Sequence, residues 1–119
     1  MAGKSKISAP PKGTGSSGSA LWRDVLSKYE LEEHETALLR EAVRCVDQLD
    51  TLAAAVAADG AMVDGRVHPA LVESRQLRLA LARLVAALRL PAGDEDDQAA
   101  GRRPQRRVGA RGVYQIRGA

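Results

Sequence analysis

The feature that most constrains the fold is a pair of long apolar-striped segments separated by a short connection. In residues 32–59, apolar residues recur in alternating steps of three and four at Leu39, Ala42, Val46, Leu49, Ala53 and Val56. In residues 69–90, they recur at Leu77, Leu81, Leu84 and Leu88. These spacings place each set on one face of an α-helix. Two amphipathic helices joined so closely must fold back on each other to cover their stripes.

The connection between the two segments has its own local signals. Asp64-Gly65 lies between short β-favouring runs, which predicts a tight glycine turn or a small β-hairpin. Gly60 suits a left-handed position at the end of the first long helix, and Pro69 suits the first turn of the second. Pro91 and Gly93 then end the second long helix.

A shorter helix is predicted before this hairpin. Trp22, Val25, Leu26 and Tyr29 follow one another at helical spacings of three and four. Ser19 is a plausible N-cap, so the helix is expected over Leu21–Tyr29. We expect Trp22 to pack against the long helix near residues 38–46 and to anchor the short helix there.

The predicted fold class is therefore all-α: a short N-terminal helix and a long antiparallel helical hairpin, with disordered termini. Residues 1–19 form a Pro/Gly/Ser-rich basic leader, 20–91 a helical oligomerisation core, and 92–119 an acidic and then Arg-rich tail. The chain has no Phe, and a small scaffold without disulfide or metal usually needs a partner. Residues expected in the core or in self-association are Trp22, Leu39, Val46, Leu49, Val56, Leu77, Leu81, Leu84 and Leu88.

The basic residues are concentrated outside the periodic core. The net charge is +3, with three Lys and no acid in the leader and six Arg against four acids in the tail. Flexible basic arms of this kind suit a polyanion such as DNA. The alternative is a solubilising tail screened by residues 94–97. Candidate DNA-binding residues are Lys4, Lys6, Lys12, Arg102, Arg103, Arg106, Arg107 and Arg111.

Three further arginines avoid the leucine stripe of the last helix. Arg75, Arg78 and Arg89 form either a solvated face or a second basic surface.

No catalytic, metal or cofactor site is predicted. Residues 13–18 fit the letters of a dinucleotide-binding loop, but no strand precedes them, and a flexible linker is the better interpretation. His34 has no Cys or His at ligand spacing, and Cys45 lies beside the apolar stripe as a buried, inert thiol. No apolar run is long enough to span a membrane, and the chain start has no signal-peptide pattern. We therefore expect a cytoplasmic, non-catalytic protein.

The order of several short motifs resembles bacteriophage terminase small subunits, particularly those of actinobacterial phages and prophages. The motifs are Leu21-Trp22-Arg23, Tyr29-Glu30-Leu31, a long helix ending in Gly60, a glycine turn, His68-Pro69 and the closing Leu88-Arg89-Leu90-Pro91. The resemblance covers about residues 10–91. Each motif is short, so the resemblance depends on the order and spacing of the motifs. The matched segment contains no clear helix-turn-helix.

This resemblance implies a role in viral DNA packaging in the cytoplasm of the infected bacterial host. Small terminase subunits form homo-oligomeric rings, bind double-stranded phage DNA, and recruit or stimulate the large subunit, which carries the ATPase and nuclease. The expected partners are thus phage DNA, the terminase large subunit and further copies of this chain.

One other interpretation remains open from the sequence, and a third is disfavoured. A coiled-coil-like structural or adaptor protein with an incidental basic tail would be helical and oligomeric, but it would not retain DNA. A small transcription regulator would need a recognition helix with exposed polar residues at its start. The first helix is too short and apolar for that role.

Overall fold

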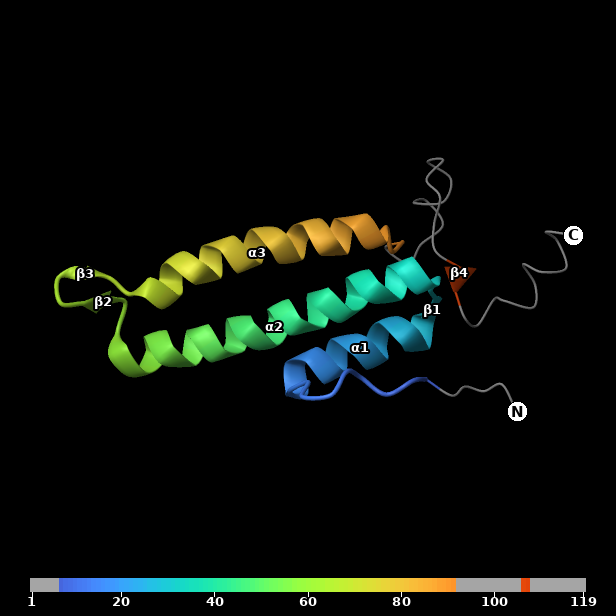
Figure 1. Ribbon diagram of the computed structural model, residues 1–119, viewed down its shortest axis with the longest axis horizontal. Coiled ribbons are helices and arrows are strands. Elements are labelled where there is room, and N and C mark those ends of the chain that lie inside the picture. Colours follow the sequence, from blue (N-terminus) through green and yellow to red (C-terminus); the bar gives the residue numbers. More distant parts are fainter. Residues whose placement is uncertain (1–6, 92–105, 108–119) are drawn as a thin grey trace, which may run out of the picture.

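The computed structural model describes residues 7–91 and 106–107. It contains three helices, α1 (Ser16–Lys28), α2 (Glu33–Asp59) and α3 (Pro69–Leu88). The helices α2 and α3 form an antiparallel pair, and α1 lies along the other side of α2 (Figure 1). The predicted short helix followed by a helical hairpin is therefore confirmed. The expectation of disordered termini falls largely outside the described residues.

A small β-hairpin joins the two long helices, as the Asp64-Gly65 signal predicted. Strands β2 (Met62–Val63) and β3 (Arg66–Val67) are antiparallel, with Met62 opposite Val67 and Val63 opposite Arg66. Asp64 and Gly65 both have positive φ, at 52° and 77°. Two consecutive positive φ values are what a type I′ two-residue hairpin turn requires, and Asp-Gly is one of the favoured pairs for it.

The ends of α2 are set by local contacts. At its start, the side chain of Glu32 accepts a hydrogen bond from the backbone of Glu35, and Glu35 accepts one in return from the backbone of Glu32. At its end, Gly60 has φ 86° and ψ 162°. Gly60 is thus the C-cap residue with a positive φ, as the sequence predicted, and α2 stops at Asp59, but the ψ of Gly60 lies outside the left-handed helical region. The N–H of Gly60 closes the last helical turn on the carbonyl of Val56, and the chain then enters β2.

His68 connects the end of α2 to the start of α3. Its Nδ1 accepts a hydrogen bond from the backbone N–H of Ala70 at 2.9 Å, which caps α3, and Pro69 occupies the first turn as predicted. Its Nε2 lies 3.0 Å from a carboxylate oxygen of Asp59. The helix ends at Leu88, earlier than Pro91 suggested, because Arg89 adopts a left-handed conformation with φ 55°.

The first helix starts earlier than the sequence suggested. It begins at Ser16 with Gly15 as N-cap residue, so the choice of Ser19 as N-cap is wrong. Residues 16–19, which composition assigns to a disordered leader, form the first turn of α1. The backbone N–H groups of Gly15 and Gly18 donate to the carboxylate of Asp47, at 2.7 and 2.8 Å. A tertiary contact, which no local pattern reveals, therefore fixes this helix end.

The hydrophobic core lies at one end of the helical hairpin. Its buried members are Trp22, Val25, Tyr29, Leu39, Val43 and Leu88. Trp22 packs among Leu39 and Val43, as predicted, and its indole N–H donates to the carbonyl of Ser8 at 2.8 Å. The hydroxyl of Tyr29 donates to the carbonyl of Pro91 at 2.9 Å. These contacts hold α1, α2 and the end of α3 together.

The opposite end of the hairpin is less well covered. Six residues of the predicted apolar stripes are only half-buried there or along the middle: Val46, Leu49, Val56, Leu77, Leu81 and Leu84. The thirteen-residue α1 spans only part of the twenty-seven-residue α2 and starts beside Asp47. Beyond that point, α2 and α3 have only each other to pack against within the described chain.

Candidate functional site

The basic residues predicted from the sequence lie mostly beyond the part of the chain that the structure describes. Lys4, Lys6, Arg102, Arg103 and Arg111 fall outside it, and Lys12 is exposed just before α1. For Arg106 and Arg107, the structure places the backbone. These two residues form β4 (Arg106–Arg107), which pairs antiparallel with β1 (Tyr29–Glu30).

The β1–β4 pairing puts part of the Arg-rich tail at a defined place. Tyr29 is opposite Arg107 and Glu30 is opposite Arg106, at the turn between α1 and α2. Figure 1 shows β4 at the same end of the molecule as the end of α3. Arg106 and Arg107 therefore lie at the end of the hairpin that contains the hydrophobic core. Sequence reasoning gave no indication of this pairing, because a two-residue strand has too little pattern to be detected.

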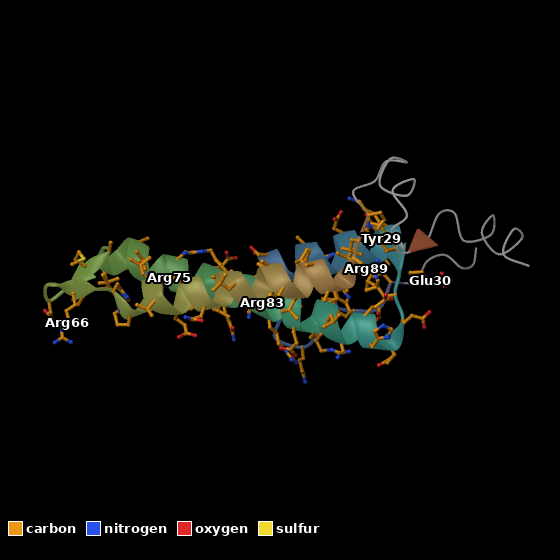
Figure 2. The ribbon with its side chains drawn as sticks, turned by 90° about the horizontal axis from the view of Figure 1, so that it is seen from above. Tyr29, Glu30, Arg66, Arg75, Arg83 and Arg89 are labelled. Atoms are coloured by element: carbon orange, nitrogen blue, oxygen red, sulfur yellow. The ribbon has the colours of Figure 1, made fainter. Side chains whose placement is uncertain are left out.

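A second group of arginines follows the other arm of the hairpin. Figure 2 shows Arg66, Arg75, Arg83 and Arg89 spread along the molecule from β3 to the end of α3. Together with Arg78, all are exposed, and within residues 7–91 their guanidinium groups form no ion pair or hydrogen bond. The segment from Ala61 to Pro91 contains these five arginines but only two acids, Asp64 and Glu73. This segment is therefore a basic surface of the folded core.

Aliphatic side chains are interspersed with these arginines. Val72, Leu79 and Val85 on α3 are exposed by 49%, 50% and 43%, and Met62 and Val67 of the β-hairpin are exposed by 56% and 49%. Apolar residues singly placed on a surface are ordinary, whereas a contiguous exposed patch marks an interaction site. Protein interfaces are enriched in arginine, methionine and aromatic residues, and their buried cores are more apolar than the remaining surface. The surface of α3 therefore has the composition of a protein interface.

The other long helix has the opposite charge. The helix α2 carries six acids and two arginines. Its last part, from Cys45 to Asp59, contains Asp47, Asp50 and Asp59 and no basic residue. Asp47 caps α1 and Asp59 contacts His68, whereas Asp50 is exposed. The hairpin is thus divided lengthwise into an acidic and a basic helix.

The glycine-rich residues 13–18 have a structural role in this arrangement. A Cβ built at Gly18 would lie 2.6 Å from a carboxylate oxygen of Asp47 and 2.8 Å from Cγ2 of Thr14. Glycine is needed at this position because the carboxylate approaches the backbone so closely. The amide groups that a phosphate would use at this helix start instead bind an internal carboxylate. This contact leaves residues 16–18 in a helix, so their interpretation as a flexible linker is wrong.

The two histidines and the cysteine do not converge. His34 is exposed in the first turn of α2, whereas His68 is at the far end of the hairpin. Among the described residues, no group of three or more His, Cys, Asp or Glu side chains is arranged to hold a metal ion. Cys45 is buried, as predicted. Burial raises the pKa of the Cys45 thiol, and the carboxylate of Glu41 raises this pKa further.

We expect the Cys45 thiol to react slowly with a disulfide reagent in the folded protein. A raised pKa means less thiolate at pH 8, and the thiolate is the reactive species. At this pH, modification should be at least about tenfold slower than in denaturant, where the thiol is exposed and has an ordinary pKa. The measurement is absorbance of the released thiol over time. Equal rates in buffer and in denaturant would contradict the burial of Cys45.

Among the helices of the described residues, none is long and apolar enough to cross a membrane. Comparisons with models of protein families, with curated proteins and with solved structures found no match to this chain.

Proposed function

We propose that this chain is the small subunit of a bacteriophage terminase, the non-catalytic component of the genome-packaging motor. In this role it assembles into a homo-oligomeric ring in the cytoplasm of the infected bacterium. It binds double-stranded phage DNA and recruits or stimulates the large subunit, which supplies the ATPase and nuclease.

The observation that carries this proposal is the order of the motifs that resemble the family. Leu21-Trp22-Arg23 lies in α1, Tyr29-Glu30-Leu31 forms the turn into α2, and His68-Pro69 starts α3. These motifs are also structural supports, because Trp22 and Tyr29 are in the core and Tyr29 binds the carbonyl of Pro91. Motifs that are far apart in sequence therefore contribute to the same packed core, and this supports the proposal.

The basic arms supply a physical route to DNA binding. Lys4, Lys6 and Lys12 precede the helical core, and Arg102–Arg117 follow it. Contacts from such residues to phosphates are individually weak and independent of base sequence. In an assembly, many tethered copies of each arm act together, which raises the overall affinity without any new contact.

Removal of the C-terminal arm tests the DNA-binding role. A chain truncated after Pro91 should keep its number of subunits but bind double-stranded DNA more weakly. The slope of log affinity against log salt should also decrease by about 0.9 for each phosphate that the shortened chain no longer neutralises. A full-length variant with Arg102, Arg103, Arg106, Arg107 and Arg111 changed to Gln is the matched control for chain length. Fluorescence anisotropy over a salt series measures both quantities.

The outcomes separate the proposal from its main alternative. Undiminished binding by the truncated chain would remove the tail from the DNA site. Failure of the full-length oligomer to bind DNA even at low salt would favour a structural or adaptor protein. That alternative is favoured by one observation, the exposed aliphatic side chains of α3, which suit a protein partner better than a phosphate backbone.

A further inference from the structure

We propose that the exposed face of α3 binds the last part of α2 in a second copy of this chain, in a head-to-tail contact. The inference rests on the self-association that is included in the proposed function, and it names the two surfaces that meet. It does not depend on DNA binding.

The first observation is the composition of the α3 face. Val72 and Leu79 are seven residues apart and therefore share one side of the helix. The half-buried Leu77 and Leu81 belong to the side that packs on α2, so Val72 and Leu79 lie on the other side, half exposed. The neighbouring Arg75 and Arg78 have no ionic partner within residues 7–91. These two apolar side chains, beside arginines without an ionic partner in residues 7–91, suit a partner surface that is apolar and acidic.

The second observation is that such a partner surface exists on the same chain. Beyond the start of α1 at Asp47, the side of α2 that α1 would otherwise cover is open, with exposed Asp50 and exposed small side chains of Ala54 and Ala57. From Cys45 to Asp59 there are three Asp and no basic residue. Small side chains let a second helix approach closely, and Asp50 is available to an incoming arginine.

Charge decides between the possible pairings of these faces. A twofold contact between two α3 helices would place arginines opposite arginines, and one between two α2 helices would place aspartates together. Such like-charge contacts across an interface are unfavourable. The contact of α3 with α2 brings opposite charges together. This contact joins two different surfaces, so a chain of copies always has a free α3 face at one end and a free α2 surface at the other. When these two ends meet, the series of contacts closes into a ring.

Charge-reversal variants test this pairing. One variant carries Arg75→Glu and Arg78→Glu, and the other carries Asp50→Arg. Each alone should weaken assembly by at least about tenfold, because like charges then meet at every contact. Mixed in equal amounts, the two should reassemble, because each contact then joins Arg with Asp or Glu with Arg. Light scattering coupled to gel filtration measures the mass, and circular dichroism checks that each variant is folded.

Matched variants make the result specific. Arg23→Glu changes an exposed arginine on α1 and should leave the mass unchanged. Leu79→Glu should weaken assembly through the apolar part of the contact. A monomeric wild-type chain would overturn the inference, as would a twofold dimer that Asp50→Arg does not affect. Unchanged mass in both charge-reversal variants would also overturn it. Loss of DNA binding by Arg75→Glu with Arg78→Glu, with the mass unchanged, would overturn it by assigning the surface to a polyanion.

Failure of the proposed function has a different signature. If the wild-type chain assembles and the variants behave as expected, but no form binds DNA, the DNA-packaging role fails while the interface stands. If DNA binding depends on the tail and the mass is insensitive to every α3 and α2 variant, the interface fails while the packaging role stands.

Discussion

Replacement of Trp22 by alanine should destabilise the protein by about 3–5 kcal/mol, as expected for truncation of a fully buried tryptophan. Trp22 is 3% exposed and contacts the cluster formed with Leu39 and Val43. The substitution leaves a large cavity between α1 and α2, and it also removes the hydrogen bond to the carbonyl of Ser8. Small domains are typically stable by about 5–15 kcal/mol, so this reduction is a large fraction of the total.

The control for this prediction is Trp22→Phe. Phenylalanine keeps most of the apolar volume but cannot donate to Ser8, so it separates packing from the hydrogen bond. The hydrogen bond alone is expected to contribute about 0.5–1.5 kcal/mol. Thermal unfolding should be compared at one protein concentration, because the melting temperature of an oligomer depends on concentration. A melting temperature of Trp22→Ala equal to that of the wild type would show that the indole is not buried.

The helices were predictable because their signals are local. The stripes of α2 and α3 recur at helical spacing over many residues, and Asp64-Gly65 has the backbone preferences that its turn demands. The ends of the helices were less predictable. The start of α1 depends on Asp47, which lies about thirty residues further along the chain. The end of α3 depends on Arg89, which takes a conformation that is more usual for glycine.

The candidate surfaces were predictable to a smaller extent. The sequence separates the basic arms from the core, and it places Arg75, Arg78 and Arg89 away from the leucine stripe. It does not reveal how much of α2 is covered by α1. That coverage depends on where α1 starts and on its length relative to α2, and the start of α1 is fixed by a tertiary contact with Asp47. The open last part of α2 and the exposed Leu79 could therefore be recognised only once the helices were placed.

Removal of the Asp47 carboxylate should have the next largest effect. Two backbone N–H groups at the start of α1 donate to it, and hydrogen bonds to a charged group typically contribute more than neutral ones. Asp47→Ala leaves both donors to water or unpaired, and we expect the free energy of unfolding to fall by about 2–3 kcal/mol. Asp47→Asn keeps one acceptor oxygen and should have a smaller effect. Gln48→Ala, on the exposed side of the same turn, should change stability by no more than about 0.5 kcal/mol.

The location of the change distinguishes Asp47→Ala from Trp22→Ala. Trp22 lies in the middle of α1, so its removal should loosen the whole helix. Asp47 binds only the first turn, so hydrogen exchange should quicken mainly in residues 15–20, while the Trp22 indole stays packed. Tryptophan fluorescence and amide exchange measure the two parts separately. Unchanged exchange in residues 15–20 would show that the start of α1 does not depend on the carboxylate. The helix would then be held by its apolar face alone.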